Sequence, residues 1–109
     1  MGQSKKDTAY AYAAGILDGE GYLTIAPRKD KRPGMPLIQV QMTSYEVIKF
    51  LYDLFEVGSV YRCKKRQPHH LLSWKWTVKY RQAYKIAQKV YPYIVLKKDK
   101  VYCILSYYK

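Results

Sequence analysis

Asp18 and Glu20 lie close together in the chain and alternate with Gly19 and Gly21. Carboxylates are the side chains of this run most suited to chemistry. The residues before them have helical spacing, which puts Glu20 at the end of a helix. A negative charge there is unfavourable by a few tenths of a kcal/mol to about 1 kcal/mol. Helix stability therefore does not explain Glu20, although a solvated acid at a helix end is the plainer alternative.

The charged residues are distributed unevenly along the 109-residue chain. Residues 1–61 hold seven basic and seven acidic residues, so that half is neutral, whereas residues 62–109 hold thirteen basic residues and only Asp99. The whole net charge of +12 thus lies in the second half. Such an excess predicts a polyanionic partner, and nucleic acid is the first hypothesis. Binding and chemistry are expected in different parts of the chain.

Several classes of protein are excluded. No run of about 18 apolar residues occurs, so a transmembrane helix and a membrane partner are not expected. The polar segment 1–7 carries no apolar signal core, and we expect a soluble intracellular protein, with organelle, phage-infected cell and prokaryotic cytoplasm left open. Cys63 and Cys103 lie far apart, and adding His69 and His70 gives no zinc-site spacing.

The positions of the apolar residues predict one domain, residues 1–109, of the α+β class. The expected order αββαββα, followed by a short helix, implies an antiparallel sheet with helices on one face. The first expected helix covers 7–19, and the second runs from Thr43 to a stop at Gly58. A third is marked by Ala83, Ile86, Ala87 and Val90 and ended by Pro92, and a short fourth covers 101–108. The expected strands cover 22–28, 37–43, 60–66 and 72–78.

The second helix has a recognisable start in the sequence Thr43-Ser-Tyr-Glu46. This is a capping-box pattern, in which the Thr43 side chain would cap the helix and Glu46 would stand three residues further on.

Alternation within the strands separates an apolar from a polar side. Leu23, Ile25, Ile38, Val40 and Met42 point inward in the first two strands, so their neighbours point outward. The outward side chains are of the kinds that contact DNA bases and phosphates. They are Thr24, Arg28, Gln39, Gln41, Lys65, Ser73, Lys75 and Thr77. An ordinary solvated sheet face is the alternative, but with the charge asymmetry this face is predicted to bind nucleic acid.

The run from Ala13 to Gly21, AAGILDGEG, resembles the LAGLIDADG motif of homing endonucleases. Ala14, Gly15, Asp18 and Gly21 match it identically, and Glu20 stands where the family usually has its second Asp. The segment Pro92–Lys98 also looks like the family's segment after its third helix. Because the element order agrees as well, the resemblance covers nearly the whole chain and implies the LAGLIDADG fold, with a saddle-shaped sheet.

The resemblance also implies a homodimer, since family members with one motif pair their motif helices. Ala11, Ala14, Gly15 and Asp18 are three or four residues apart, so they form a strip on one helix face that would allow close approach of a second helix. Packing inside the protomer's own core is the alternative interpretation of this strip.

Pairing of the motif helices would bring two copies of Glu20 together beside the Gly19 carbonyl. Two close carboxylates favour a cation between them, and the family implies Mg2+, with Mn2+ as a possible substitute. The implied basic residue near the scissile phosphate is Lys97, with Lys98 as a close rival. Gln41 is a candidate polar active-site residue, and Ser44 and Lys49 are weaker ones. Asp18 is assigned to structure at the helix end rather than to catalysis.

The implied function is metal-dependent hydrolysis of both strands of a long, pseudo-palindromic DNA site. The implied gene is intron-encoded, with an intein or a free-standing gene as alternatives. His69 and His70, in a basic turn, are expected to contact phosphate or solvent. The rival functions are an intron RNA-splicing maturase and a non-cleaving DNA-binding protein of the same fold. A basic RNA-binding module of another class would not explain the Gly-Glu-Gly sequence at the helix end.

Overall fold

The computed structural model describes residues 5–29, 33–63 and 71–108. Helices and strands follow one another in the predicted order, with one short 3-10 helix added before the last helix. The elements are α1 (Lys5–Glu20), β1 (Gly21–Ala26), β2 (Met35–Met42), α2 (Tyr45–Phe55), β3 (Ser59–Cys63), β4 (Ser73–Lys79), α3 (Tyr80–Val90), η1 (Tyr91–Tyr93) and α4 (Lys98–Tyr107).

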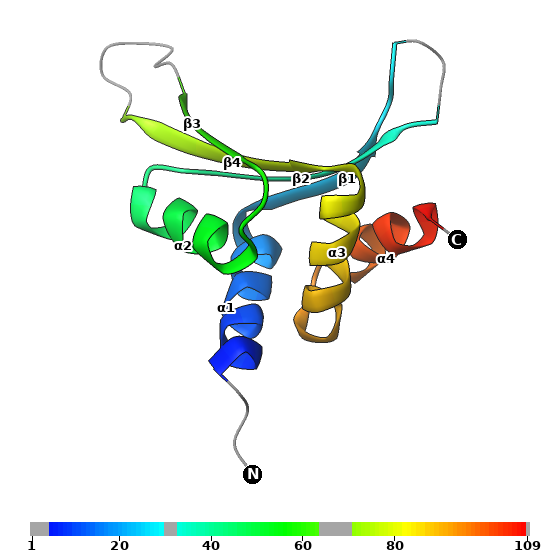
Figure 1. Cartoon of the computed structure of the whole chain (residues 1–109), viewed down its shortest axis with the longest axis horizontal. Helices are drawn as coiled ribbons and strands as arrows, with labels where there is room; N and C mark the ends of the chain where they lie inside the picture. Colours follow the sequence, from blue (N-terminus) through cyan, green and yellow to red (C-terminus); the bar gives the residue numbers. More distant parts are fainter. Residues whose placement is uncertain (1–4, 30–32, 64–70, 109) are drawn as a thin grey trace.

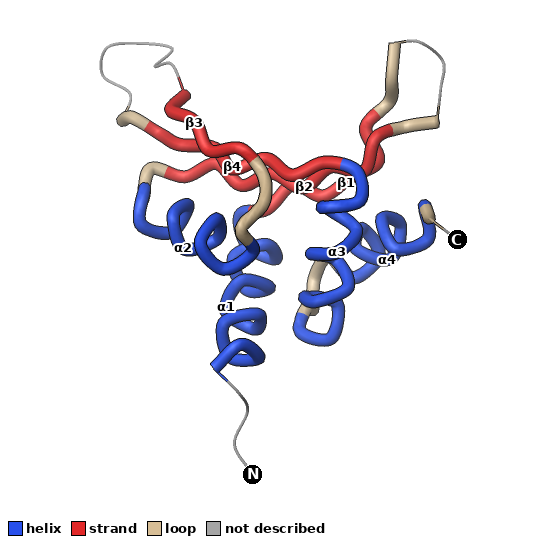
Figure 2. The backbone as a smooth tube through the Cα atoms, in the orientation of Figure 1, coloured by secondary structure: helices blue, strands red, loops and turns tan. Residues whose placement is uncertain are grey.

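The four strands form one antiparallel sheet in the order β1-β2-β4-β3. All the helices lie on one face of this sheet, and the opposite face is free of them (Figure 1). The sheet bends away from the helices at both ends, so this outer face is a trough (Figure 2). The predicted α+β class, with an antiparallel sheet and helices on one face, is confirmed.

The core lies between the sheet and the helices. It is built by the alternation that the strands require: Leu23, Ile38, Val40, Trp76 and Val78 point to the helical face and are buried. The helices contribute small and branched residues from their inner stripes, namely Ala13, Ala14, Leu17, Ile48, Leu51, Ala83, Ile86, Ala87, Val90, Val101 and Ile104. Leu37 was expected to point to solvent. It lies on the outer face but is nearly buried, flanked on the two sides by Thr24 and Lys79.

The junction between α1 and β1 is unusually tight. The helix was expected to stop at Gly19. It continues to Glu20 instead, and the strand begins at Gly21. A Cβ atom on Gly21 would lie 2.7 Å from the Leu17 carbonyl oxygen, so only glycine fits there. The consequence is that Glu20 stands at the boundary between the helix and the sheet.

The ends of α2 differ from the predicted ones. Ser44 rather than Thr43 is the N-cap, and its hydroxyl accepts a hydrogen bond from the Val47 amide at 3.4 Å. Glu46 therefore falls too early in the helix to complete a capping box, which requires the third helical position. At the other end, Glu56 in the left-handed conformation closes the helix before Gly58.

The strands are shorter than predicted at their loop ends. Arg28 lies two residues beyond the end of β1, and β3 ends at Cys63. The predicted site residue Lys65, with His69 and His70, lies outside the described residues. No helix among the described residues is long and apolar enough to span a membrane.

Candidate active site and nucleic-acid interface

Asp18 fastens the end of α1 to a distant segment of the chain. Its Oδ2 accepts a hydrogen bond from the Val95 amide at 2.7 Å, and its Oδ1 accepts from the Leu96 and Lys97 amides, both at 3.0 Å. Three amides converging on one carboxylate fix the 95–97 backbone against the motif helix. Asp18 is thus engaged inside the protomer, in keeping with a structural role.

Lys97 and Lys98 point to different places. The Lys97 ammonium donates to the Leu17 carbonyl at 3.1 Å and to the Gly21 carbonyl at 2.5 Å, so it binds the C-terminal end of α1 on both sides of Glu20 in the sequence. A cation is favourable at that end of a helix.

The Lys98 ammonium instead donates to the Tyr91 carbonyl at 2.7 Å and to the Ile94 carbonyl at 3.3 Å. It also lies 4.3 Å from the centre of the Tyr91 ring. Of the two rivals, Lys97 is therefore the one beside the acidic helix end, and Lys98 closes the turn around η1.

A row of polar side chains crosses the sheet from Glu20. Gly21 pairs with Val40, so Glu20, one residue earlier, stands level with Gln41, one residue later on the antiparallel strand. Gln41 in turn pairs with Lys75, and Lys75 with Tyr61. Paired residues of antiparallel strands point to the same face. The row Gln41, Lys75 and Tyr61 therefore lies on the outer face, and Glu20 directly precedes the strand next to its Gln41 end.

Gln41 is held in place by a neighbour on β4. Its side-chain Nε2 donates to the Ser73 hydroxyl at 3.0 Å, and both residues were predicted to contact DNA. The Lys75 ammonium also lies 5.9 Å from the centre of the Tyr61 ring, in a cation–π contact.

The donors near Glu20 suit a hard divalent cation but do not complete its site within one chain. Glu20 and Gly19 are exposed, and they supply a carboxylate and a backbone carbonyl. Among residues 5–29, 33–63 and 71–108, no three His, Cys, Asp or Glu side chains come together. A Mg2+ ion needs six oxygen ligands, so the others must come from water, from a phosphate or from a second copy of the chain.

The weaker active-site candidates have other contacts. Ser44 caps α2, and the Lys49 ammonium pairs with the Asp53 carboxylate at 2.6 Å on the exposed face of the same helix. The hydrogen bond to Asp53 raises the pKa of Lys49. Neither contact directs these residues toward Glu20.

The outer face of the sheet brings together six of the eight predicted DNA contacts. The strand register places Thr24, Gln39, Gln41, Ser73, Lys75 and Thr77 on this face. Among the unpredicted residues that it also places there, four carry a hydroxyl or an ammonium group: Tyr22, Ser59, Tyr61 and Lys79. Extending the period-2 alternation through β3 from Val60 would have found Ser59 and Tyr61.

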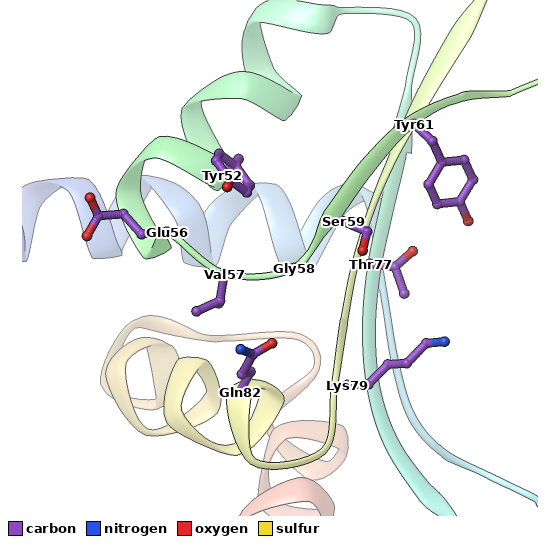
Figure 3. Close-up of a pocket in the computed structure, with 9 residues that line it drawn as sticks. All are labelled: Tyr52, Glu56, Val57, Gly58, Ser59, Tyr61, Thr77, Lys79 and Gln82. Carbon is purple, nitrogen blue, oxygen red and sulfur yellow. The ribbon is translucent and has the colours of Figure 1, made fainter.

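A hollow of about 460 Å³ marks the end of this face (Figure 3). Tyr61, Thr77 and Lys79 project from the sheet on one side, whereas Tyr52 and Gln82 come from the helices on the other. The Thr77 hydroxyl is buried and has no hydrogen-bond partner among the described residues. The Thr77 hydroxyl is therefore not open to DNA in this conformation.

The exposed face of α1 differs from the strip that the sequence suggested. Ala14 is 0% exposed inside the protomer, Ala11 is half-buried, and Asp18 is held by the 95–97 amides. Gly15 is exposed, and so is Gly19 one turn later; a Cβ atom on either would meet nothing within 4 Å. Tyr12 is 59% exposed on the same side. The open face therefore consists of Tyr12, Gly15 and Gly19.

Comparison with known proteins finds similarity of fold rather than of sequence. No family model matches the chain, and no curated protein matches it. The homing endonuclease I-CvuI, solved with its target in the presence of Ca, superposes with a TM-score of 0.73 at 20% identity, covering 93% of this chain and 66% of that one.

Two further structures are similar in the same way. The archaeal intron-encoded homing endonuclease I-Vdi141I, complexed with DNA, gives a TM-score of 0.72 at 16% identity, with 94% of this chain and 67% of that one covered. The LAGLIDADG homing endonuclease I-GzeII, in complex with a DNA target, gives a TM-score of 0.67 at 17% identity, with 89% of this chain and 34% of that one covered. The chain thus spans about two thirds or less of these relatives.

The fold of this chain is that of the LAGLIDADG homing endonucleases. The resemblance first seen in the run from Ala13 to Gly21 is confirmed for the fold, because this run forms the end of α1 directly before the sheet and the superposition on I-CvuI covers 93% of the chain.

Proposed function

We propose that this protein is a DNA homing endonuclease that acts as a homodimer and makes Mg2+-dependent double-strand breaks. The observation that carries the proposal is the position of Glu20, an exposed carboxylate at the end of a motif helix on whose open face Gly15 and Gly19 have no described residue within 4 Å of where a Cβ atom would stand. Two such helices packed along a two-fold axis would bring their Glu20 ends together at the sheets.

The open face of α1 supports the dimer. Glycine inside a helix costs about 0.5 to 1 kcal/mol relative to alanine. Gly15 and Gly19 have room for a side chain, so nothing among the described residues requires them to be glycine. A closely packed helix from a second copy would require glycine at both positions, since that helix would occupy the space where the Cβ atoms would stand.

The proposed roles follow from the contacts. Glu20 and the Gly19 carbonyl would hold Mg2+, which when bound polarises the scissile phosphate and lowers the pKa of bound water. Lys97 binds the carbonyls on either side of Glu20, so it would orient the acidic end and place a positive charge beside the phosphate. Gln41, fixed by Ser73, would orient substrate or water next to Glu20.

The outer face would bind the DNA. Its polar and cationic side chains match the groups that contact base edges and phosphates, and a two-stranded ribbon fits the major groove. The dimer would carry twice the chain's +12, so its affinity for DNA is expected to fall steeply as the salt concentration rises.

Plasmid cleavage tests this function. The substrate carries the host DNA that flanks the gene, joined without the insert. We expect the wild type to linearise this plasmid with Mg2+ but not with EDTA, and Glu20→Gln to bind the site without cutting it. Glu56→Gln is the matched control, because Glu56 is also an exposed acid at a helix end, and it should cut normally. A wild type that never cuts would refute the nuclease, and a Glu20→Gln variant that cuts normally would refute the role of Glu20.

A further inference from the structure

Two apolar side chains project from a segment whose backbone is firmly held. Val95 is 77% exposed and Leu96 is 79% exposed. The amides of the same two residues are hydrogen-bonded to the Asp18 carboxylate, so the segment is fixed beside the end of α1. Exposed apolar side chains on a fixed backbone are ready to be buried with little loss of conformational entropy.

A surface hollow of about 420 Å³ lies between α1 and the beginning of α2. Its lining comprises Tyr12, Ser44, Glu46, Val47 and Phe50. Tyr12 meets Phe50 edge to face, with ring centres 5.1 Å apart, so the apolar wall of the hollow has a defined shape. Its size suits one or two aliphatic side chains.

The projecting segment and the hollow lie on opposite sides of the same helix. Figure 1 shows α1 standing between α2 on one side and α3 with α4 on the other. Because α1 intervenes, Val95 and Leu96 of a protomer are separated from that protomer's own hollow. Rotation by 180° about an axis along α1 exchanges the two sides, so the projecting segment of one copy would face the hollow of the other.

We propose that Val95 and Leu96 of each protomer insert into the Tyr12–Phe50 hollow of a second copy of this chain. The inference rests on the proposed homodimer and adds the contacts that hold it together on both sides of the paired helices. The interface is isologous, so each contact occurs twice. Asp18 acts as a positioning residue, since its carboxylate presents the segment.

The charges around the two surfaces are complementary. The lining of the hollow includes one acidic residue, the exposed Glu46. Leu96 is followed by three lysines, Lys97, Lys98 and the exposed Lys100, and by one acid, Asp99, so this segment is positively charged on balance. Opposite charges at the rim of an interface favour the correct orientation of two partners and speed their encounter.

Cysteine cross-linking tests the contact directly. Cys63 and Cys103 are first replaced by serine, and Val47→Cys is then combined with Leu96→Cys. We expect a disulfide-linked dimer under oxidising conditions, with no bridge inside a single chain. Leu71→Cys combined with Leu96→Cys is the matched control, because Leu71 is 77% exposed in the hairpin far from α1, and this pair should remain unlinked.

A charge substitution tests the energetic importance of the contact. Leu96→Asp should raise the dimer dissociation constant about 100-fold in sedimentation equilibrium, because a buried leucine is lost on each side of the axis. The circular dichroism spectrum should be unchanged, since the Leu96 backbone contact to Asp18 remains. Leu71→Asp, a leucine of nearly the same exposure, should leave the dissociation constant unchanged.

The outcomes separate this inference from the proposed function. If the wild type dimerises but the Val47–Leu96 pair stays unlinked and Leu96→Asp dimerises normally, the insertion is wrong and the homodimer stands. If the wild type is a monomer both free and on DNA, the homodimer and the insertion both fail.

Discussion

The two faces of α1 carry similarly small residues in opposite surroundings. Ala13 and Ala14 are completely buried against the protomer's own core. Gly15 and Gly19, on the other side, face open space. The buried pair is explained by packing within one chain, whereas the open pair costs helix stability and gains nothing there. In the proposed homodimer, α1 would make two contacts, and a single protomer contains only the first of them.

Filling the open face of α1 is expected to have the largest effect. Gly15→Leu should raise the dimer dissociation constant by about 100-fold or more, since a branched side chain would prevent close approach of the second helix. The unfolding free energy of the monomer should not fall, because the new side chain meets open space. Sedimentation equilibrium and urea unfolding measure the two quantities.

A control separates this effect from that of an added surface leucine. Lys85→Leu places the same side chain on the exposed face of α3 and should leave the dissociation constant unchanged. A Gly15→Leu variant that dimerises like the wild type would show that the open face of α1 is not the interface.

The buried face should respond in the opposite way. Ala14→Leu is expected to lower the unfolding free energy by about 1 to 3 kcal/mol, because the added atoms overpack a core position without free space. Urea unfolding at a protein concentration below the dimer dissociation constant isolates the effect on the monomer. Equal stability of Ala14→Leu and the wild type would contradict the distinction between the two faces.

The sequence predicted which part of the chain forms α1 but not how the helix is rotated. Ala14 and Gly15 are both small, and the spacing rule placed them in one strip with Ala11 and Asp18. Which of them faces the core depends on how α1 packs under the sheet and beside α3, and these contacts come from distant parts of the sequence. Strands are simpler in this respect, because their alternation has two faces only, and it identified most of the outer face correctly.

Lys97 and Lys98 provide a smaller test at the end of the same helix. Each donates to two backbone carbonyls, so replacing either with methionine should lower the unfolding free energy by about 1 kcal/mol. Only Lys97→Met should also slow plasmid cleavage, since Lys97 alone of the two binds beside Glu20. Equal loss of cleavage in both variants would contradict the assignment of Lys97.

The sequence alone could not predict which of these two lysines lies beside Glu20, and the reason is physical. They are adjacent and chemically identical, and the hydrogen bonds that separate them go to residues as remote as Leu17 and Gly21. The same holds for Asp18, whose partners lie 77 to 79 residues away. The sequence indicated a structural role for Asp18 but contained no signal for its partners.

The smallest effect is expected for Gly15→Ala. Alanine is the better helix former, so the unfolding free energy of the monomer should rise by about 0.5 to 1 kcal/mol. The change in urea midpoint gives this value. A lower midpoint would mean that Gly15 is required within the protomer, and the case for a second copy on this face would lose its main support.

In the proposed homodimer two copies of Glu20 form one cutting centre, and mixed dimers test whether both are needed. Wild type and Glu20→Gln are refolded together in varying proportions, and linearisation of the target plasmid is measured with Mg2+. We predict that double-strand cleavage falls with the square of the wild-type fraction, to about one quarter in an equal mixture, because both subunits must carry the acid. A fall in direct proportion to the wild-type fraction would mean that each chain cuts on its own and would contradict the account.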